Sequence, residues 1–298
     1  MALPFRRRIT LVAALLLLCV SIAAQSDQPK PMPKAADRDR SPVDLVLTKD
    51  QDRLITLNQS AGTVSVVDRA GGKVICEVAC GERPCAMALS TDEKRLAVTA
   101  TFSGELVLFR FDGDRLTEEA RTYLSFEPRG VALSPDGRAA YVALTSGHCI
   151  AEVDLNSKQV RRKIDCGKWP RYLAITPDGK RLAVGCSGDG GVCVIDLAEG
   201  KRVHQDEFLG LNLGMMQMDQ AGKFVYFPFM VYRGNPITKR NIQIGWVLAT
   251  RIGRLNVGEE SRREAFSLDK QGEAVADPQG LALSPDEQWL VCAASGSP

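Results

Sequence analysis

A short phrase recurs six times along this chain and constrains its fold more than any other feature. A typical copy has a small apolar pair, a Ser or Thr and a turn built on Asp, as in the run from Ala132 to Asp136. Pro presets φ in such a turn, and Asp hydrogen-bonds its own backbone. The turn positions are Asp50, Asp92, Asp136, Asp178, Ala221 and Asp286, at intervals of 42, 44, 42, 43 and 65 residues. A repeat of about 40–45 residues is typical of one four-stranded β-propeller blade.

Strand signals follow the turn in the same order within the clear repeats. A β-branched and aliphatic run such as residues 140–143 comes first, a loop with Gly or Ser follows, and a third strand ends on an acidic residue such as Asp196. A more polar segment, such as residues 158–164, fits the solvent-facing outer strand of a blade. We therefore predict an all-β fold, a β-propeller of four-stranded blades over residues 43–298.

The sixth repeat stops after its second strand, at Pro298. A propeller closes its ring, because an open ring leaves an apolar blade face and unpaired strand edges exposed. We expect about five and a half blades of an incomplete ring, with a seven-bladed parent whose remaining blades, and any further domain, lie beyond Pro298.

Two stretches resemble a known family of repeats. The run from Ser134 to Ala143 (SPDGRAAYVA) is similar to the YVTN-type bacterial propeller repeat, and so is the run from Thr176 to Val184 (TPDGKRLAV). The resemblance covers about residues 43–298 and implies a propeller. Such propellers occur in surface-layer and binding proteins, lactonase-like enzymes, nitrite reductase and amine-dehydrogenase heavy chains, and some are attached to di-haem peroxidase-like cytochrome domains. Function must therefore be argued from a site, because this fold serves many activities.

The N-terminus predicts export. Three arginines at positions 6–8 precede an apolar run from Ile9 to Ala24, which ends on small residues. This pattern is typical of a secretory signal peptide over residues 1–24, and it favours a periplasmic or secreted protein. A retained membrane anchor is the alternative, although the apolar run is short for a spanning helix. Residues 25–42 contain four prolines and mixed charges, as a disordered linker does.

The charge of the processed chain argues against polyanionic partners. The sequence has 38 basic residues, three of them in the predicted leader, so that 35 remain against 36 acidic residues. A nearly neutral surface offers no general attraction to nucleic acid or to an anionic membrane. We therefore expect neither as a partner after the leader is removed.

Eight cysteines remain after the predicted cleavage. Cys186 and Cys193 flank a Gly-rich hairpin loop in the fourth repeat, so they are a candidate disulfide across two strands. His148, Cys149, Cys166 and Cys186 fall on loops of one rim and are weaker candidates for a soft metal such as copper or zinc. The alternative is that these thiols fill the core as small apolar groups. Their spacing matches no metal-binding signature.

Motifs of catalysis are missing from the sequence. It has two histidines, no C-x-x-C-H haem-attachment motif, and no H-E-x-x-H, G-x-S-x-G or Walker motif. We therefore expect no cofactor in this chain. A c-type haem is expected only if a further domain follows Pro298.

The candidate binding residues lie on one rim of the predicted propeller. The fifth repeat carries about 22 extra residues, many of them in a basic and aromatic loop between its second and third strands. Arginines beside prolines lead into other blades, and we expect the loop to approach them and to form a site for an anionic ligand or an acidic partner. In the alternative, the insertion is merely tolerated and each arginine pairs within its own blade. The candidates are Arg83, Arg129, Arg171, Tyr232, Arg233, Lys239, Arg240 and Trp246.

These features favour an exported binding or interaction module without a catalytic site of its own. Its partner would be a protein or a small anionic ligand at the rim. The first alternative is the propeller portion of a periplasmic redox enzyme, with a cytochrome-type domain as its neighbour. The second is a lactonase-like hydrolase, which the shortage of histidine disfavours.

Overall fold

The computed structural model describes residues 39–258, 263–269 and 274–295. These residues belong to one compact unit, Asp39–Pro298. The predicted signal peptide and most of the predicted linker lie outside the described residues. Among the residues described, no helix is long and apolar enough to cross a membrane.

Each of the first four blades contains four antiparallel strands in chain order. The first blade has β1 (Pro42–Leu47), β2 (Arg53–Asn58), β3 (Thr63–Asp68) and β4 (Lys73–Ala79). The second has β5 (Pro84–Leu89), β6 (Arg95–Ala100), β7 (Glu105–Phe111) and β8 (Leu116–Tyr123). The third has β9 (Pro128–Leu133), β10 (Ala139–Leu144), β11 (Cys149–Asp154) and β12 (Gln159–Asp165). The fourth has β13 (Pro170–Ile175), β14 (Arg181–Cys186), β15 (Gly191–Asp196) and β16 (Lys201–Glu207).

The last two blades depart from this plan. The fifth has β17 (Gln217–Met218), β18 (Phe224–Tyr232), β19 (Leu248–Asn256) and β20 (Glu264–Ser267), with the short helix α2 (Lys239–Gln243) between β18 and β19. The sixth has β21 (Pro278–Leu283) and β22 (Leu290–Ala294). Five four-stranded sheets and one two-stranded sheet thus make up the described part of the chain. The predicted all-β propeller with about five and a half blades is confirmed.

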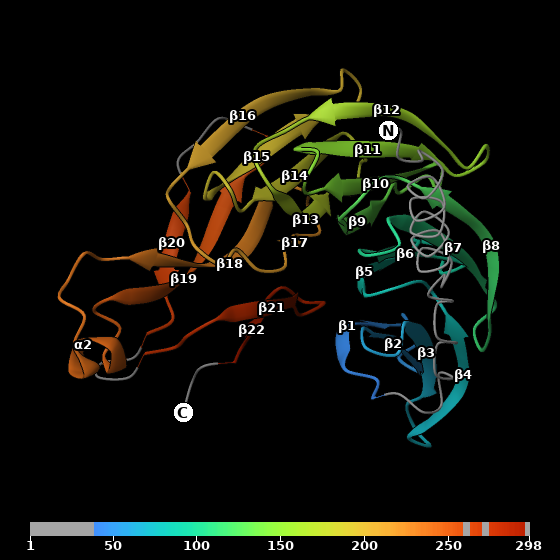
Figure 1. Cartoon of the computed structure of the whole chain (residues 1–298), viewed down its shortest axis with the longest axis horizontal. Coiled ribbons are helices and arrows are strands. Elements are labelled where there is room, and N and C mark those ends of the chain that lie inside the picture. The colour runs from blue at the N-terminus through green and yellow to red at the C-terminus, as the bar shows by residue number, and fades with distance from the viewer. Residues whose placement is uncertain (1–38, 259–262, 270–273, 296–298) are drawn as a thin grey trace, which may run out of the picture. The chain divides into compact units, whose positions relative to one another are not determined.

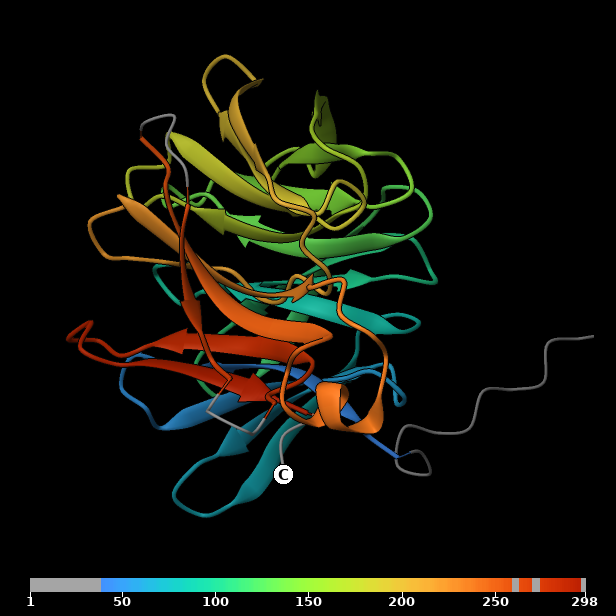
Figure 2. The ribbon, with the colours of Figure 1, turned by 90° about the vertical axis from the view of Figure 1, so that its left-hand side faces the viewer.

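Neighbouring blades contact each other through their inner strands. β1 contacts β5, β5 contacts β9, β9 contacts β13, β13 contacts β17, and β17 contacts β21. Figure 1 shows the first strand of each sheet facing inward and the fourth strand on the outside. The second view shows the same sheets stacked one upon another (Figure 2).

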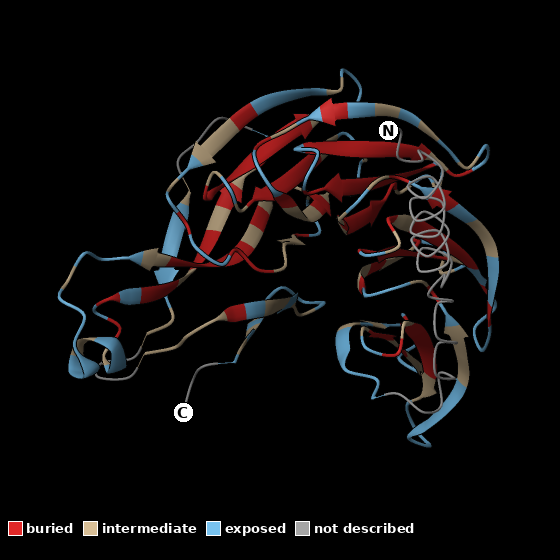
Figure 3. Cartoon of the chain, viewed as in Figure 1, coloured by how far each residue is buried: buried red, intermediate tan, exposed pale blue. Residues whose placement is uncertain are grey.

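The core lies between successive sheets. Phe109 of β7, for example, shares one cluster with Ile55 of β2 and Val66 of β3 in the preceding blade. In the third blade the middle strands are almost wholly buried, whereas the outer strand has exposed and half-buried positions (Figure 3). Because a sheet buries its faces only against its neighbours, the stacking of blades supplies the hydrophobic stabilisation.

The recurring phrase is explained by a repeated turn. The Ser134 hydroxyl donates to the Asp136 carboxylate at 2.6 Å and accepts from the Ala139 backbone N–H at 2.8 Å. The hydroxyl of Ser134 holds the pKa of Asp136 below its usual value. The same hydroxyl-to-carboxylate bond recurs in four other blades, at Thr48, Ser90, Thr176 and Ser284. The phrase therefore has a structural role.

Candidate functional site

A strained backbone conformation recurs where the inner strand of a blade begins. The residue directly before the first proline of the strand has a positive φ in five blades, from 47° at Arg83 to 67° at Glu127. Residues other than glycine seldom adopt this conformation, and it is found at functional sites more often than elsewhere. The full set is Ser41, Arg83, Glu127, Trp169 and Asp277.

Arg129 and Arg171 occupy the position after the proline. The pairing of the inner strand with the second strand shifts register there in both blades. Such bulges redirect a side chain away from the regular alternation of a strand. The two arginines are therefore equivalent in the repeat and are presented in the same way on one rim.

Arg83 differs from the other two predicted arginines. It precedes its proline, so its equivalents are Glu127 and Trp169 and not Arg129 or Arg171. Its guanidinium donates to the Gln59 side chain at 3.3 Å and lies 5.1 Å from the centre of the Phe102 ring. Arg83 thus contacts the loops of the first two blades.

In each of the first three blades, a side chain just after the second strand donates a hydrogen bond to the backbone of the next blade. Thr145 donates to the Pro170 carbonyl at 2.8 Å, and Thr101 donates to the Pro128 carbonyl at 3.2 Å. Gln59 makes the corresponding bond, at 3.4 Å, to the second blade. Since the acceptor is the carbonyl of the proline that opens the next inner strand, these bonds fix the rim.

The series is broken at the fourth blade. Ser187 is equivalent to Thr145, because its backbone N–H donates to the Trp169 carbonyl as that of Thr145 donates to the Glu127 carbonyl. The Ser187 Oγ atom is nonetheless buried and has no partner among the described residues. The segment leading into the fifth blade replaces the proline by Leu213. The degenerate fifth repeat therefore leaves a polar atom unsatisfied at the junction.

A cavity of about 530 Å³ lies between the third and fourth blades, with Ser187 in its wall. Its walls come from the third and fourth blades, from the loops that lead into β9 and β13 and the loops after β10 and β14. It is lined by Glu127, Arg129, Thr145, Ser146, His148, Trp169, Arg171 and Ser187. Two of the predicted rim arginines thus share one cavity, whereas Arg83 does not line it.

The charges of the cavity are only partly balanced. Arg129 pairs with Glu127 at 3.1 Å, so the alternative of pairing within the blade applies to this arginine. Its Nε atom is buried and has no partner in the described part of the chain. Arg171 has no ion pair with any described carboxylate, and its guanidinium lies 5.8 Å from the centre of the Tyr172 ring. An unpaired guanidinium therefore belongs to the lining of the cavity, and two unsatisfied polar atoms lie buried in residues of the same lining.

The imidazole of His148 and the indole of Trp169 complete the lining of the cavity. The Nδ1 atom of His148 accepts the backbone N–H of Trp169 at 3.2 Å, which joins the loops of the third and fourth blades. Trp169 is 56% exposed, although the strand that follows it, β13, has only buried and half-buried residues. An exposed indole beside guanidinium groups offers an apolar surface to the non-charged part of a ligand.

The two cysteines predicted to pair are neighbours in adjacent strands. Cys193 lies opposite Val184 and Cys186 lies opposite Gly191, so that the thiols are diagonal neighbours on one face of the sheet. Their Sγ atoms are 3.8 Å apart, and both thiols are free. No bond joins them in the structure, and the disulfide stays a prediction.

The residues proposed for a soft metal are divided between two sides of the third blade. Cys149 is buried in the cluster between the second and third blades, whereas Cys166 packs on the cluster between the third and fourth. The Cys166 thiol donates to the His148 carbonyl at 3.4 Å. Within the described ranges, no three His, Cys, Asp or Glu side chains are arranged to hold a metal ion.

The inserted loop of the fifth blade does not line this cavity. It lies with α2 at the outer end of that blade, away from β9 and β13 (Figure 1). The expected approach to Arg129 and Arg171 is therefore not seen. Arg233, Lys239 and Arg240 are exposed, and Tyr232 and Trp246 are 59% and 53% exposed. Thr238 caps α2 by accepting the Asn241 backbone N–H at 3.1 Å.

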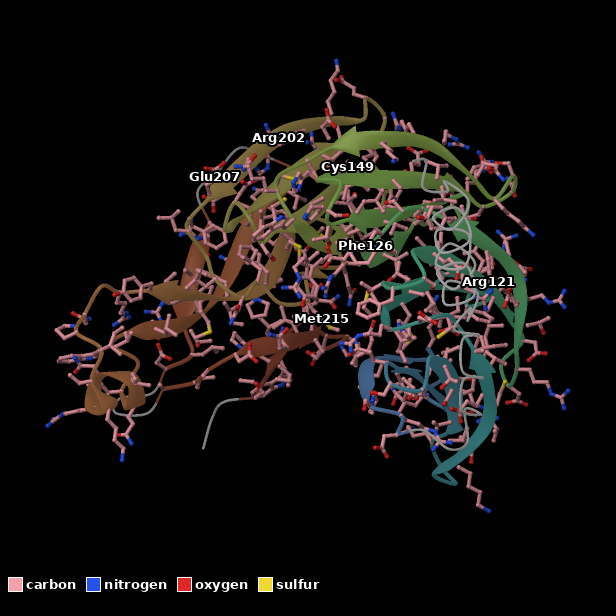
Figure 4. The ribbon with its side chains drawn as sticks, viewed as in Figure 1. Arg121, Phe126, Cys149, Arg202, Glu207 and Met215 are labelled. Carbon is pink, nitrogen blue, oxygen red and sulfur yellow. The ribbon has the colours of Figure 1, made fainter. Side chains whose placement is uncertain are left out.

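The fifth blade reaches the centre through another segment. Met215 lies beside the sixth blade (Figure 4), and its backbone N–H donates to the Gln279 carbonyl at 2.8 Å. The Tyr172 hydroxyl donates to the Gln279 side chain at 3.4 Å. Burial raises the pKa of Tyr172, so this phenol stays a hydrogen-bond donor at neutral pH.

Glu127, Trp169 and Ser187 line the cavity but were not among the predicted site residues. A signal for the first two was present, because each precedes the proline that opens an inner strand. No signal marked Ser187, since its hydroxyl is unsatisfied only because the next blade begins differently.

Residues 19–242 match the model of a protein family that is described as the YNCE-like β-propeller. The chain belongs to this family. The predicted resemblance to bacterial propeller repeats is thereby confirmed. A comparison of this YNCE-like propeller with curated proteins found no match.

Solved structures share the propeller fold. Hydrazine synthase from Kuenenia stuttgartiensis has a TM-score of 0.77 at 24% identity, over 85% of this chain and 73% of that chain. A functionally unknown protein from Desulfotomaculum acetoxidans has a TM-score of 0.65 at 13% identity, over 85% and 79% of the two chains. A Bacteroides uniformis protein proposed to be a 6-phosphogluconolactonase has a TM-score of 0.60 at 15% identity, over 84% and 76%. At these identities the similarity shows the fold alone.

Proposed function

We propose that this YNCE-like propeller is an exported binding module whose rim cavity takes a carboxylate group. The observation that carries this proposal is the set of unsatisfied polar groups in one cavity: the buried Arg129 Nε and Ser187 Oγ atoms and the unpaired Arg171 guanidinium. Buried polar atoms without partners are uncommon in folded proteins, because each costs about 1–3 kcal/mol. A carboxylate bound by Arg171 would bring acceptor oxygens next to the two buried atoms, which reach it once the Arg129 and Ser187 side chains turn toward the cavity.

The chemistry of the cavity favours a carboxylate over other ligands. A guanidinium binds a carboxylate through two parallel N–H···O bonds, and Arg171 has these donors unused. The Ser187 hydroxyl adds a donor, and the exposed Trp169 ring can cover an apolar portion of the ligand. Glu127 neutralises one of the two arginines, so the cavity suits a singly charged group better than a polyanion.

The carboxylate can belong to a small molecule or to an acidic side chain of a protein. Both sources can be tested by tryptophan fluorescence in a Trp246→Phe, Trp289→Phe background, in which Trp169 is the remaining tryptophan. The probes are butyrate, a peptide with one Glu and a blocked C-terminus and, as a comparison, inorganic phosphate. A response to butyrate indicates a small-molecule site, and a response to the peptide alone indicates a protein partner.

Matched variants test the residues. Arg171→Gln is expected to abolish the response, because it removes a guanidinium that has no ion pair in the described structure. Arg171→Lys should weaken it, since an ammonium cannot make two parallel bonds. Arg83→Gln is the control, because Arg83 lies on the same rim outside the cavity. Equal loss of binding in the Arg83 and Arg171 variants, or no response to either carboxylate probe, would refute the proposal.

Export is a separate part of the proposal. It is supported by the basic and apolar N-terminal sequence, which predicts a mature chain that begins after Ala23 or Ala24. Sequencing the N-terminus of protein from the periplasmic fraction tests it. An intact Met1 in the membrane fraction would overturn this part without bearing on the cavity.

A redox enzyme is the second candidate. It retains the alternative drawn from the sequence, and a structure named hydrazine synthase, an enzyme, shares the fold. The chain has no haem-attachment motif, so the haem would belong to another domain or partner. Haem absorption in protein purified from its native host would support this candidate. The lactonase-like alternative predicts hydrolysis of a sugar lactone by the purified chain.

A further inference from the structure

Three cysteines meet at the interface between the third and fourth blades, next to the rim cavity. Cys186 closes β14, Cys193 lies in β15, and Cys166 lies between β12 and β13. The Cys186 and Cys193 Sγ atoms are 3.8 Å apart, and Cys166 packs on the same cluster. The neighbouring thiol of Cys166, together with burial, raises the pKa of Cys186. Two of the sulfurs are therefore direct neighbours, and Cys166 packs on the cluster that contains both.

The group runs from the surface into the core. Cys193 is fully buried and Cys186 is 1% exposed, whereas Cys166 is partly exposed. The backbone of Gly167 passes directly over the Cys186 thiol, because a Cβ atom on Gly167 would lie 2.8 Å from that sulfur. The inner pair is therefore shielded from solvent, and Cys166 is the more exposed thiol of the three.

Packing alone does not require thiols at these positions. In the second blade, Ala100 and Val107 stand in the positions of Cys186 and Cys193, as the pairing registers show. In the third blade the same positions hold Leu144 and Ala151. Since apolar side chains fill the equivalent positions in the other blades, packing does not explain why cysteines stand here, and the thiols are available for a chemical role.

We propose that Cys166, Cys186 and Cys193 form a thiol–disulfide exchange site whose substrate is a low-molecular-weight disulfide such as oxidised glutathione. The Cys166 thiolate attacks the glutathione disulfide, and one glutathione leaves as a thiol. The Cys186 thiol attacks the Cys166 sulfur of the mixed disulfide, loses its proton and expels the second glutathione. The Cys193 thiol then attacks Cys186, which forms the Cys186–Cys193 disulfide and returns Cys166 to its thiol. Two protein thiols are oxidised, and one glutathione disulfide is reduced to two thiols.

The order of the steps follows from access. The contact with the Cys186 thiol, together with desolvation, raises the pKa of Cys193. Little of this thiol is therefore ionised, and it is a poor nucleophile toward reagents in water. Cys186 lies beside Cys193, and Cys166 packs on the cluster that contains Cys186, so we assign Cys186 to both protein disulfides. The predicted Cys186–Cys193 disulfide is thus the end product, and Cys166 is the residue through which it forms.

Peptide mapping by mass spectrometry after treatment of the folded chain with oxidised glutathione tests the proposal. The unsubstituted protein should yield a Cys186–Cys193 disulfide. Cys193→Ser should stop at a Cys166–Cys186 disulfide, and Cys186→Ser should stop at glutathione on Cys166. Cys166→Ser should slow formation of the inner disulfide by about tenfold or more, because the remaining thiols are buried.

Two controls keep the test decisive. Cys76→Ser removes another partly buried thiol, in the first blade, and should leave the rate unchanged. In 8 M urea, roughly the concentration that unfolds most domains, the Cys166→Ser variant should form the inner disulfide at the rate of the unsubstituted protein. The proposal is wrong if the folded Cys166→Ser variant oxidises at the normal rate, or if glutathione attaches first to Cys186.

Discussion

Gly130 lies against the backbone of Arg171, and a Cβ atom at position 130 would stand 2.4 Å from the Arg171 carbonyl oxygen. This close approach joins the inner strands of the third and fourth blades directly behind the two arginines of the cavity. It explains how side chains that are 42 residues apart in sequence come to share one site.

Replacing Gly130 by Ala should therefore strain the blade interface. We expect Gly130→Ala to lower the free energy of unfolding by about 1–3 kcal/mol, as other overpacked sites do. Urea denaturation measures the change. Gly280→Ala is the matched control, because Gly280 holds the same repeat position in the sixth blade and its added Cβ atom would meet Ala293 only at 3.4 Å. Equal destabilisation by the two substitutions would contradict this account.

The hydroxyl bonds between blades predict opposite results at two equivalent positions. Thr145→Val should cost about 1–3 kcal/mol, because it leaves the buried Pro170 carbonyl without its donor. Ser187→Ala should be neutral or slightly stabilising, since the hydroxyl that it removes has no partner. Thermal denaturation of the two variants compares them. A larger loss at Ser187 than at Thr145 would show that the serine hydroxyl is already satisfied.

Asp44 predicts a dependence of stability on pH. Burial raises its pKa to about 6, although it accepts backbone N–H bonds from Met87 and Leu45. When the pKa of a carboxyl group is higher in the folded than in the unfolded state, the free energy of unfolding of the protein decreases as the pH rises between the two pKa values. We expect the contribution of Asp44 to be most favourable below pH 4 and to be lost by about pH 6.

Asp44→Asn should remove this dependence. The amide stays neutral and keeps an acceptor for the Met87 N–H, so the variant should melt about 2–4 °C higher at pH 7.5, the shift expected from ~1 kcal/mol in a domain of this size. At pH 4 the two proteins should melt at nearly the same temperature. Thermal denaturation at both pH values measures the shift. A constant difference at all pH values would show that Asp44 acts through packing and not through its charge.

The buried carboxylate of Glu152 predicts a strongly non-additive result. It is 3% exposed and pairs with Arg161 at 3.0 Å and with Arg162 at 2.6 Å. Replacing both arginines by Met leaves an uncompensated buried charge and should cost about 3–5 kcal/mol. Adding Glu152→Gln to that variant should recover most of the loss. Urea denaturation of the four proteins in this cycle gives the coupling, and simple additivity would refute it.

The recurring phrase and the alternating strands were enough to predict the blades, because a repeat of fixed length with turns at Asp136 and its equivalents leaves few other ways to bury two faces of each sheet. The site was only partly predictable. Arg129 and Arg171 could be predicted because each follows a proline, at the position where the strand bulges. Arg83 was grouped with them, but it precedes its proline and therefore does not lie in the bulge.

The local order of the chain could be predicted from its residues: the turns, the strands, the insertion in the fifth repeat and the closeness of Cys186 and Cys193 across one hairpin. These features depend on residues close together in the chain. Contacts between blades, such as the packing of Cys166 on the cluster of Cys186, became known only from the folded structure, and so did groups that lack a partner, such as the Ser187 hydroxyl. Those relationships depend on how one sheet stacks on the next, and a stacking distance of a few ångströms decides whether a hydrogen bond forms.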